Sequence, residues 1–433
     1  MHDVVTDPGR FLRDLVAVGV AAADPRVCLP PVLPPPLAAG RTCIIAIGKA
    51  AAGMALAARR TCGPGCTGLV VVRHGFPVDD AELGPGFEVI HAGHPVPDAA
   101  SERAGRRALE LAGQLTAQDR LLALISGGGS ALADVPLPGV MLEDIQALTR
   151  TLLASGAPID RINAVRRALS RFKGGGLAAA AWPAEVVTCL ISDVPGDAPG
   201  AIASGPTVPG PADLPACLAI LRRHAVDVPP RVMQVLASAG TQDARPVRDR
   251  AAPAPFILAA SGHTALAAAA RRARAAGVAV LDLGDRLQGD ARDLARDHSR
   301  LALAALAEDR NQPLLILSGG ESSVRIDGTA RPGGRGGRNL TYLLALALAL
   351  DAASGIHAIA CDSDGLDGTS PAAGAIIGPT TLARARALGL DPAACLAGHD
   401  SHQLFEALGD LVVTGQTGTN VNDIRAILIQ PRA

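Results

Sequence analysis

The chain has 433 residues, 48% of them hydrophobic, and this length suggests two domains of ordinary size. Its formal net charge is −1, and only 2% of its residues are aromatic. The near-neutral charge without a basic stripe argues against a nucleic-acid partner, and the scarcity of aromatic residues argues against stacking platforms for single-stranded nucleic acid.

The amino terminus carries acidic residues and no early apolar run, which argues against a secretory signal. The leucine- and alanine-rich stretch 343–350 is far shorter than the ~20 residues that cross a bilayer, so we expect a buried helix there. Eight cysteines are scattered without the spacing of a disulfide framework. We therefore expect a cytoplasmic protein with no membrane partner, and assembly into a homo-oligomer stays open.

Residues 1–39 are expected to form an amino-terminal helix and a proline-rich connector, and that helix could pack on either domain. Short apolar runs then recur, each followed by glycines and a helical pattern, which is typical of α/β proteins. The sequence predicts two Rossmann-like α/β domains over 40–230 and 255–433, with mainly parallel or mixed sheets and a linker over 231–254. The predicted strands are 43–47, 69–72, 121–125, 186–191, 256–260, 314–317 and 358–360.

Only two of the 40 basic residues other than histidine are lysines, Lys49 and Lys173, and both precede or follow glycines. A lysine ammonium is a compact point charge that a planar guanidinium does not replace, and it commonly holds a phosphate. We interpret both lysines as phosphate ligands. The alternative is that these two lysines were retained by drift and have no role in binding.

A glycine loop follows the strand predicted at 121–125. Its backbone N–H groups can converge on an anion, and the terminus of the next helix would add partial positive charge. A tight turn without a ligand is the alternative. The cofactor-binding residues expected in this domain are Ser126, Gly127, Gly128, Gly129, Ser130 and Lys173.

Two further loops of the first domain carry side chains that could bind a metal, and we interpret only one of them as a binding site. Asp193 and Asp197 flank a Pro-Gly turn after the strand predicted at 186–191, and their oxygens suit Mg²⁺. Capping of the next helix is the alternative. His91 and His94 are interpreted as part of a turn.

The second domain places carboxylates and arginines in glycine-bearing loops. Glu321 follows a predicted strand, and Arg338 ends an arginine- and glycine-rich stretch that begins at Arg331. Such a stretch favours close approach of an anionic ligand, with a disordered surface loop as the alternative. Asp362, Asp364 and Asp367 follow the strand at 358–360 within six residues, where one carboxylate could bind a metal and another could accept a hydroxyl proton.

The segment Gly63-Pro-Gly65-Cys-Thr-Gly68 matches the dinucleotide fingerprint by letters alone. It precedes a predicted strand, whereas a true fingerprint follows a strand and opens a helix. We interpret it as a turn.

The ordered set of motifs resembles the glycerate 2-kinases whose carboxyl-terminal part is the MOFRL domain. The resemblance runs from about residue 44 to 424, nearly the whole chain. The matching segments are Gly-Lys49-Ala-Ala, His74-Gly, Ala-Gly-His94-Pro-x-Pro, Ser-Gly-Gly-Gly-Ser130-Ala-Leu, Asn163-x-Val-Arg166, Leu-Ser170-x-x-Lys173-Gly-Gly, Ser192-Asp-Val-x-Gly-Asp197, Ile-Ala-Ser204-Gly-Pro-Thr207, Gly-Gly-Glu321, Gly-Gly-Arg338-Asn339, Asp364-Gly-x-Asp367-Gly and Thr-Gly-x-Thr417-Gly-Thr-Asn420-Val-Asn-Asp423.

This resemblance implies ATP-dependent, Mg²⁺-assisted transfer of a phosphoryl group to the 2-hydroxyl of D-glycerate, which gives 2-phosphoglycerate. The residues that match its catalytic set are Lys49, Arg338 and Asp364, in an active site expected in the cleft between the domains. Ser126 to Ser130, Lys173 and Glu321 would then bind the nucleotide. Asp193, Asp197 and Asp367 are the expected metal ligands.

The chain departs from the family pattern at Ala168, where a histidine is common, and at Leu340 and Thr341, where Gln-Glu is common. These departures put the substrate preference in doubt. Two other functions stay open, an NAD(P)H-dependent hydroxypyruvate reductase and a non-catalytic sugar-phosphate-binding protein.

Overall fold

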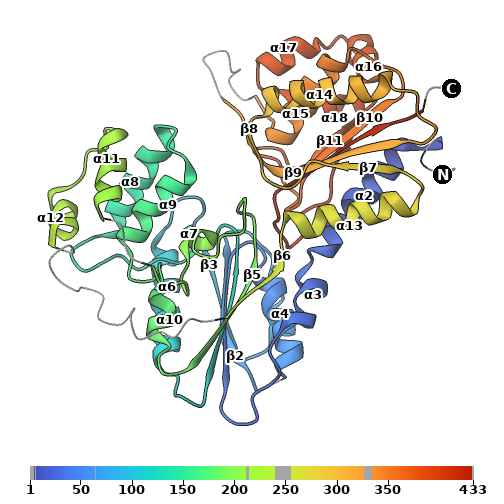
Figure 1. Cartoon of the computed structure of the whole chain (residues 1–433). Helices are drawn as coiled ribbons and strands as arrows, with labels where there is room; N and C mark the ends of the chain where they lie inside the picture. The colour runs from blue at the N-terminus through green and yellow to red at the C-terminus, as the bar shows by residue number, and fades with distance from the viewer. Residues whose placement is uncertain are drawn as a thin grey trace. The chain divides into compact units, whose positions relative to one another are not determined.

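The computed structural model describes residues 4, 6–63, 65–210, 214–238, 255–325 and 334–431, and it divides into two compact units (Figure 1). Pro25–Ala259 form the amino-terminal unit. Met1–Asp24 and Ala260–Ala433 form the carboxyl-terminal unit. Each unit is described by itself below.

The amino-terminal unit is built on a six-stranded sheet of order β3-β2-β1-β4-β5-β6, whose pairs among β1 to β5 are parallel. The central strands β1 and β4 are aliphatic and buried along their whole length, as strands covered on both faces should be. The carboxyl ends of these strands therefore lie at one edge, where the sequence places its glycines. The strands are β1 (Thr42–Ile47), β2 (Thr67–Arg73), β3 (Phe87–Ala92), β4 (Arg120–Ser126), β5 (Glu185–Ile191) and β6 (Phe256–Ala260).

The helices of this unit pack in two groups. One group covers the sheet, and α8, α9, α11 and α12 enclose a separate hydrophobic core (Figure 1). The helices are α3 (Pro25–Cys28), η1 (Pro30–Val32), α4 (Ala51–Cys62), α5 (Asp80–Leu83), α6 (Ala99–Gly113), α7 (Gly129–Leu132), α8 (Leu142–Ala154), α9 (Ile159–Ala168), α10 (Gly176–Ala180), η2 (Ile202–Ser204), α11 (Leu214–Arg223) and α12 (Pro230–Ser238).

Helix α12 corrects the expected start of the linker. The sequence analysis begins the linker at residue 231, but Val232 and Leu236 are buried in the second core of the amino-terminal unit. The prolines and charged residues around this segment suggested a linker, although the segment itself forms an amphipathic helix. The remainder of the expected linker, 239–254, lies outside the described residues.

The carboxyl-terminal unit contains a mixed sheet of order β12-β11-β10-β13-β9-β7, with β8 beside β9. The pairs of β9 with β7 and β8 are parallel, and the other pairs are antiparallel. The two sheets agree with the predicted α/β fold with parallel or mixed sheets. The strands are β7 (Ala279–Asp282), β8 (Leu287–Asp290), β9 (Leu314–Ser323), β10 (Ile356–Asp362), β11 (Gly374–Ile377), β12 (Leu411–Val412) and β13 (Asp423–Ile429).

Helix α15 is the most buried helix on this sheet, since nearly every side chain from Asn339 to Leu350 is enclosed. This confirms the buried helix expected at 343–350. Leu340 and Thr341 are also enclosed there, so the two departures from the family pattern face the protein interior. The helices of this unit are α2 (Pro8–Ala22), α13 (Gly262–Ala275), α14 (Ala291–Ala307), α15 (Arg338–Leu350), α16 (Thr381–Ala387), α17 (Pro392–Ala397) and α18 (Ser401–Leu408).

Helix α2 packs in the carboxyl-terminal unit, which decides between the two positions expected for it. Asp14 pairs with Arg272 of α13 at 2.8 Å, and Thr419 Oγ1 donates to the carbonyl of Ala23 at 2.7 Å. Gly19 allows the close approach, because a Cβ there would lie 3.2 Å from the carbonyl oxygen of Ala265.

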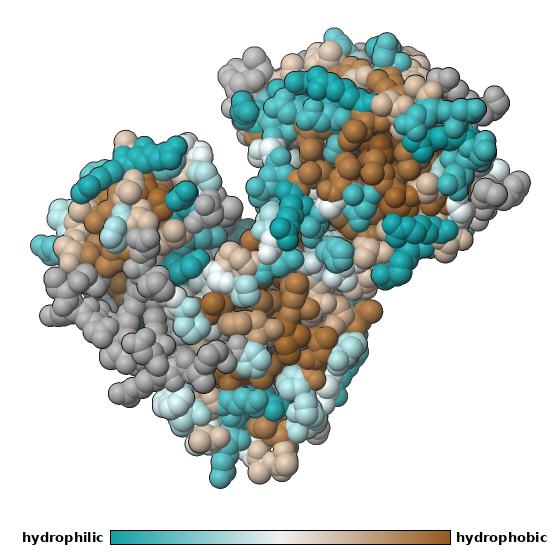
Figure 2. All heavy atoms as spheres, in the orientation of Figure 1, coloured by the Kyte–Doolittle hydropathy of each residue, from teal (hydrophilic) through white to brown (hydrophobic). Residues whose placement is uncertain are grey.

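Some apolar side chains of the carboxyl-terminal unit lie outside its core. Leu281, Leu301 and Leu303 are exposed, and Figure 2 shows a hydrophobic area on this unit bordered by hydrophilic side chains. Across the described residues, no single helix is both long and apolar enough to span a membrane, and one bent pair, Pro8–Ala22 with Pro25–Val32, passes by length and composition only.

Candidate active site

The glycine loop of the amino-terminal unit lies beside the residues that follow β1. The backbone N–H of Lys49 donates to the carbonyl of Gly127 at 2.9 Å, and that of Ala50 donates to Ser126 Oγ at 3.0 Å. Gly48 has a φ of 132°, and a Cβ there would overlap Ser126. Glycine is therefore required at Gly48, and the two loops form one structure at the carboxyl edge of the sheet.

Three side chains, from the loops that follow β1, β3 and β5, meet this loop. A Cβ on Gly128 would lie 3.3 Å from His94 Nε2 and 3.4 Å from Lys49 Cγ. A Cβ on Gly127 would overlap the carboxylate of Asp193. The glycines thus leave room for a lysine, a histidine and a carboxylate. The sequence analysis missed His94 as a site residue. The strand before it, β3, was not predicted, and the available signal was the place of His94 in the matching segment Ala-Gly-His94-Pro-x-Pro.

Ser130 faces inward from the loop. Its Oγ donates to Asn163 Oδ1 at 3.2 Å and lies 2.8 Å from Ser204 Oγ, and Arg166 donates to its carbonyl at 2.7 Å. The following helix α7 has only four residues. The helix dipole expected here is therefore small, so the anion site predicted at this loop would depend mainly on backbone N–H groups.

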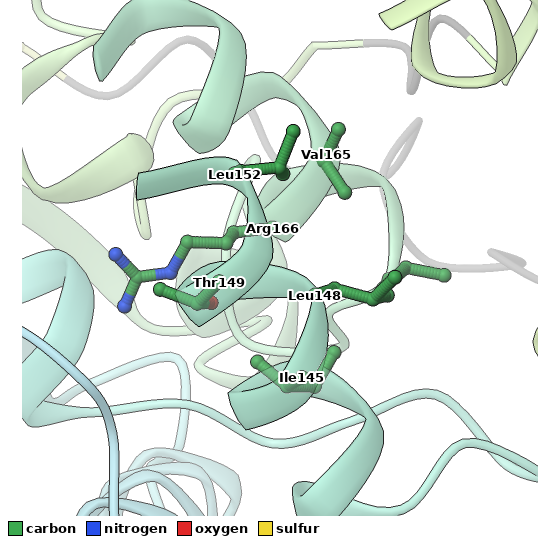
Figure 3. A pocket seen from close by; sticks show the side chains of 7 residues that line it. Ile145, Leu148, Thr149, Leu152, Val165 and Arg166 are labelled. Carbon is green, nitrogen blue, oxygen red and sulfur yellow. The ribbon is translucent and has the colours of Figure 1, made fainter. Parts of the chain in front are cut away.

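Arg166 joins this loop to the helical core. Its guanidinium points away from a small pocket lined by Leu148, Thr149 and Val165 among others, as Figure 3 shows. Burial lowers the pKa of Arg166. The hydrogen bond from Arg166 to the carbonyl of Ser130 thus links the glycine loop to helix α9.

Lys173 lies buried beside Asp134. Its Nζ lies 2.6 Å from Asp134 Oδ2 and donates to the carbonyl of Ala133 at 3.2 Å, and the two charged side chains are 0% and 1% exposed. Burial lowers the pKa of Lys173 to about 8, while Asp134 opposes this shift. The structure thus places Lys173 in a buried ion pair, and the expected nucleotide contact stays a prediction.

The carboxylates expected to bind metal in this unit lie in one loop. Asp193 lies against the glycine loop, and Asp197, with a φ of 55°, donates its N–H to the carbonyl of Val194 at 3.0 Å. Across the part of the chain that is described, no three His, Cys, Asp or Glu side chains are arranged to hold a metal ion. Mg²⁺ at nucleotide sites often takes one or two carboxylates with phosphate oxygens and water, so this donor set fits only such a shared site.

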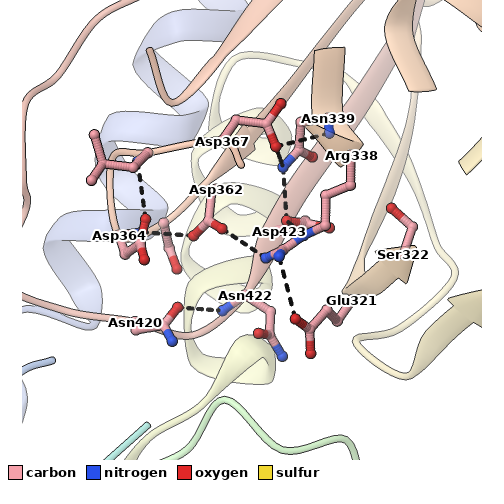
Figure 4. Close-up of polar contacts among 12 residues, drawn as sticks. Glu321, Ser322, Arg338, Asn339, Asp362, Asp364, Asp367, Asn420, Asn422 and Asp423 are labelled. Atoms are coloured by element: carbon pink, nitrogen blue, oxygen red, sulfur yellow. Dashed lines mark hydrogen bonds and ion pairs between the residues drawn. The ribbon is translucent and has the colours of Figure 1, made fainter. Parts of the chain in front are cut away.

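Arg338 is surrounded by carboxylates in the carboxyl-terminal unit (Figure 4). Its Nε donates to Asp423 Oδ1 at 2.8 Å, one terminal nitrogen to Asp362 Oδ2 at 2.7 Å and the other to Glu321 Oε1 at 3.2 Å. Burial alone would lower the pKa of Arg338, but these three carboxylates raise it above the ordinary value. Of the arginine- and glycine-rich stretch 331–338, residues 331–333 lie outside the described residues.

Asp364 joins this cluster through Asp362. The backbone N–H of Asp364 donates to Asp362 Oδ1 at 2.9 Å, and Asp364 Oδ1 accepts the N–H of Leu366 at 2.9 Å. Thr417 donates its N–H to the carbonyl of Asp364 at 3.2 Å. The polar loop before β13 and the Asp364 loop are therefore parts of one site.

Asp367 caps helix α15. Its two oxygens accept the backbone N–H groups of Asn339 at 3.1 Å and Leu340 at 2.9 Å. Burial raises the pKa of Asp367 to about 6, although these bonds oppose the shift. The structure shows Asp367 fully buried as a helix cap, and the expected metal role stays a prediction.

The sequence analysis names Asp362 among three candidate carboxylates without assigning it a role of its own, and it assigns no role to Asp423. Asp362 and Asp423 lie opposite each other where β10 ends and β13 begins. The position of Asp362 after a predicted strand was a usable signal, whereas strand β13 was not predicted.

Two family models match the chain. Residues 11–237 match a domain of unknown function, DUF4147, and residues 314–423 match the MOFRL family. The first match alone covers more than half of the chain.

Similar proteins carry two kinds of name. A protein of Agrobacterium vitis named "Putative hydroxypyruvate reductase" is 46% identical over 97% of this chain and 94% of its own length. The D-glycerate 2-kinase of Thermotoga maritima is 36% identical, covering 90% and 91%, and human glycerate kinase is 35% identical, covering 90% and 84%.

The crystal structure of the T. maritima glycerate kinase superposes with a TM-score of 0.83 at 34% identity, covering 97% of this chain and 99% of that one. Family models, relatives and fold thus agree over nearly the whole length. The chain belongs to the glycerate kinase family, in which a DUF4147 domain precedes a MOFRL domain.

Proposed function

We propose that this protein is a glycerate 2-kinase that transfers the γ-phosphoryl group of ATP to the 2-hydroxyl of D-glycerate. The observation that carries the proposal is the connected cluster of Arg338, Asp362 and Asp364 in the carboxyl-terminal unit. Phosphoryl transfer needs a fixed cation for the transferring charge and a carboxylate for the hydroxyl proton. Arg338 and Asp364 supply these two groups.

The amino-terminal unit would bind phosphates of the nucleotide. The backbone N–H groups of Gly127 and Gly128 would contact the phosphates, and Lys49 would add a positive charge beside them. Asp193, with Asp197 nearby in sequence, would hold Mg²⁺ together with phosphate oxygens. When bound, Mg²⁺ neutralises charge on the phosphates. Glu321 stays a predicted nucleotide contact, with a side chain 45% exposed.

The reductase name of some relatives is the main rival. The only sequence match to a dinucleotide fingerprint begins at Gly63, which ends α4, and finishes at Gly68 inside β2. A Cβ on Gly68 would overlap the carbonyl of Ile44 in β1, so this glycine serves strand packing. That arrangement weighs against NAD(P)H binding through this motif. A non-catalytic binding protein would have no need of Asp364.

We place the reaction in the cytoplasm. All eight cysteines are free thiols in the structure, which supports a reducing compartment. The partner is then a small molecule, D-glycerate.

The decisive test incubates purified protein with D-glycerate, ATP and Mg²⁺ and identifies the product by ³¹P NMR. We expect ADP and the 2-phospho isomer, with both lost in Arg338→Ala. A parallel reaction contains hydroxypyruvate and NADH or NADPH. Oxidation of either cofactor, with no ADP formed from glycerate, would contradict the proposal, and formation of 3-phosphoglycerate would contradict the assigned hydroxyl.

A further inference from the structure

Asp423 lies between two arginines at the start of β13. Its Oδ1 accepts from Arg338 Nε at 2.8 Å, and its Oδ2 accepts from Arg425. Asp423 is 0% exposed and Arg425 is 1% exposed, so neither side chain reaches solvent. Neither residue has a role in the function proposed above.

We propose that Asp423 is a positioning residue that aims Arg338 at an anionic ligand, and that Arg425 shares the charge of Asp423, so that Asp423 neutralises less of the charge of Arg338. The identity of that anion, a transferring phosphoryl group, rests on the proposed function. The arrangement of Arg338, Asp423 and Arg425, called the arginine clamp below, does not depend on the proposed function.

The bonds of Arg338 define a held side and an open side. A guanidinium has five N–H donors. Asp423 takes the single donor on Nε, while Asp362 and Glu321 take one on each terminal nitrogen. One N–H remains on each terminal nitrogen, and these donors can bind phosphate or carboxylate oxygens.

Asp423 is placed by backbone structure on several sides. In the sheet it lies opposite Asp362 of β10 and Gly320 of β9. Asn339 Nδ2, from the first turn of α15, donates to Asp423 Oδ1 at 2.8 Å. Three strands and a helix therefore fix the carboxylate that fixes Arg338.

Arg425 is held behind Asp423. It donates to the carbonyl of Gly319 at 3.1 Å and to Ser322 Oγ at 3.2 Å, and its guanidinium lies 5.5 Å from the ring centre of Tyr342. Because Arg425 is enclosed by protein, its guanidinium does not contact a ligand that enters from solvent. Its effect is electrostatic, because it offsets a carboxylate that would otherwise act on Arg338 alone.

The first test measures binding of ethylguanidinium to Arg338→Ala by titration calorimetry at constant ionic strength. The variant leaves an empty slot between carboxylates, and we expect the added cation to bind there. Adding Asp423→Asn should weaken binding by about tenfold, since a charge-assisted bond is lost, whereas adding Glu321→Gln at the exposed partner should weaken it less. Adding Arg425→Gln should tighten it, and Arg425→Lys should leave it unchanged.

Asp144→Asn is the matched control. Asp144 is also a buried carboxylate paired with an arginine, Arg231, at 2.7 Å, but it lies in the other unit. Combined with Arg338→Ala, it should leave ethylguanidinium affinity unchanged. Equal affinity with and without Asp423→Asn would overturn the positioning role, and unchanged or weaker affinity with Arg425→Gln would overturn the role of Arg425.

The second test measures turnover. Ethylguanidinium should restore activity to Arg338→Ala and fail to restore it when Asp423→Asn is added, while KM for ATP stays constant. Restoration in both would overturn the inference. If no phosphoryl transfer is found in the wild type, the proposed function fails, and the binding test still decides whether Asp423 positions the guanidinium.

Discussion

At the scale of single residues, Lys49 is the charge whose shape should matter most. It lies beside the glycine loop, where a Cβ on Gly128 would already contact its side chain. Lys49→Arg keeps the charge but introduces a larger planar group, so we expect kcat for glycerate phosphorylation to fall by about a hundredfold. Arg41→Lys, an exchange at an exposed arginine paired with Asp119 away from the glycine loop, is the control. Near-normal turnover of Lys49→Arg would refute the role assigned to Lys49.

Lys173 should instead determine stability. Lys173→Met leaves Asp134 buried without its ammonium partner, which we expect to cost about 3–5 kcal/mol of the free energy of unfolding. Adding Asp134→Leu removes the stranded charge and should recover most of that loss. Urea denaturation measures both. If the Lys173→Met, Asp134→Leu variant is as stable as the wild type but has a greatly raised KM for ATP, Lys173 binds the nucleotide after all.

These two lysines show what sequence alone predicts at this scale. Both are rare lysines next to glycines, and the sequence analysis interprets both as phosphate ligands. The difference is a partner, Asp134, that the fold brings to Lys173 from a distant part of the chain. Such long-range pairing leaves no local pattern, so the sequence could not separate a ligand from a core ion pair.

At the scale of elements, the glycine loop and the loop after β5 should be coupled. Gly127→Ala would push a methyl group into Asp193, and we expect KM for Mg²⁺-ATP to rise. Gly65→Ala is the control, because a Cβ there meets nothing within 4 Å. In the Asp193→Ala background the added Gly127→Ala should have little further effect. Fully additive effects of the two substitutions would contradict the coupling.

Helix α15 should give the protein a distinctive pH dependence through its capping residue. The pKa of Asp367 is raised by burial from 3.8 to about 6, so the folded state holds this proton more tightly than the unfolded state. Its stability contribution is present below about pH 4 and is lost as pH rises through about 6, a change of about 3 kcal/mol. The difference in unfolding free energy between wild type and Asp367→Asn, measured from pH 4 to 7, should fall by this amount. A constant difference would contradict the raised pKa.

The predictability of elements depended on how local their signals are. All seven apolar runs predicted as strands are strands, because runs of β-branched and aliphatic residues favour buried strands, whether the pairing is parallel or antiparallel. Strand β13 was missed because its polar start, Asp423, continued a loop-like pattern. The roles of Asp362 and Asp423 depend on that strand, so the arginine clamp could not be derived from the sequence.

At the scale of the whole molecule, the chain order and the packing order differ. The first helix belongs with the last part of the chain, and residues 25–259 form the unit between them. The family model that begins at residue 11 therefore crosses the boundary between units. This discontinuity makes the stability of the carboxyl-terminal unit depend on the other end of the sequence.

The discontinuity can be tested on α2. Leu15 is fully buried, and we expect Leu15→Ala to destabilise the carboxyl-terminal unit by about 2–5 kcal/mol through a cavity in its core. Gly19→Leu should act similarly, because its side chain would meet Ala265 and Ile424. Hydrogen exchange should speed up in α13 and β13 and stay unchanged in β1 and β4. Val27→Ala, at an exposed side chain of the amino-terminal unit, should change neither. Equal acceleration in β4 would show that α2 stabilises both units, because local stability follows the elements that a segment contacts.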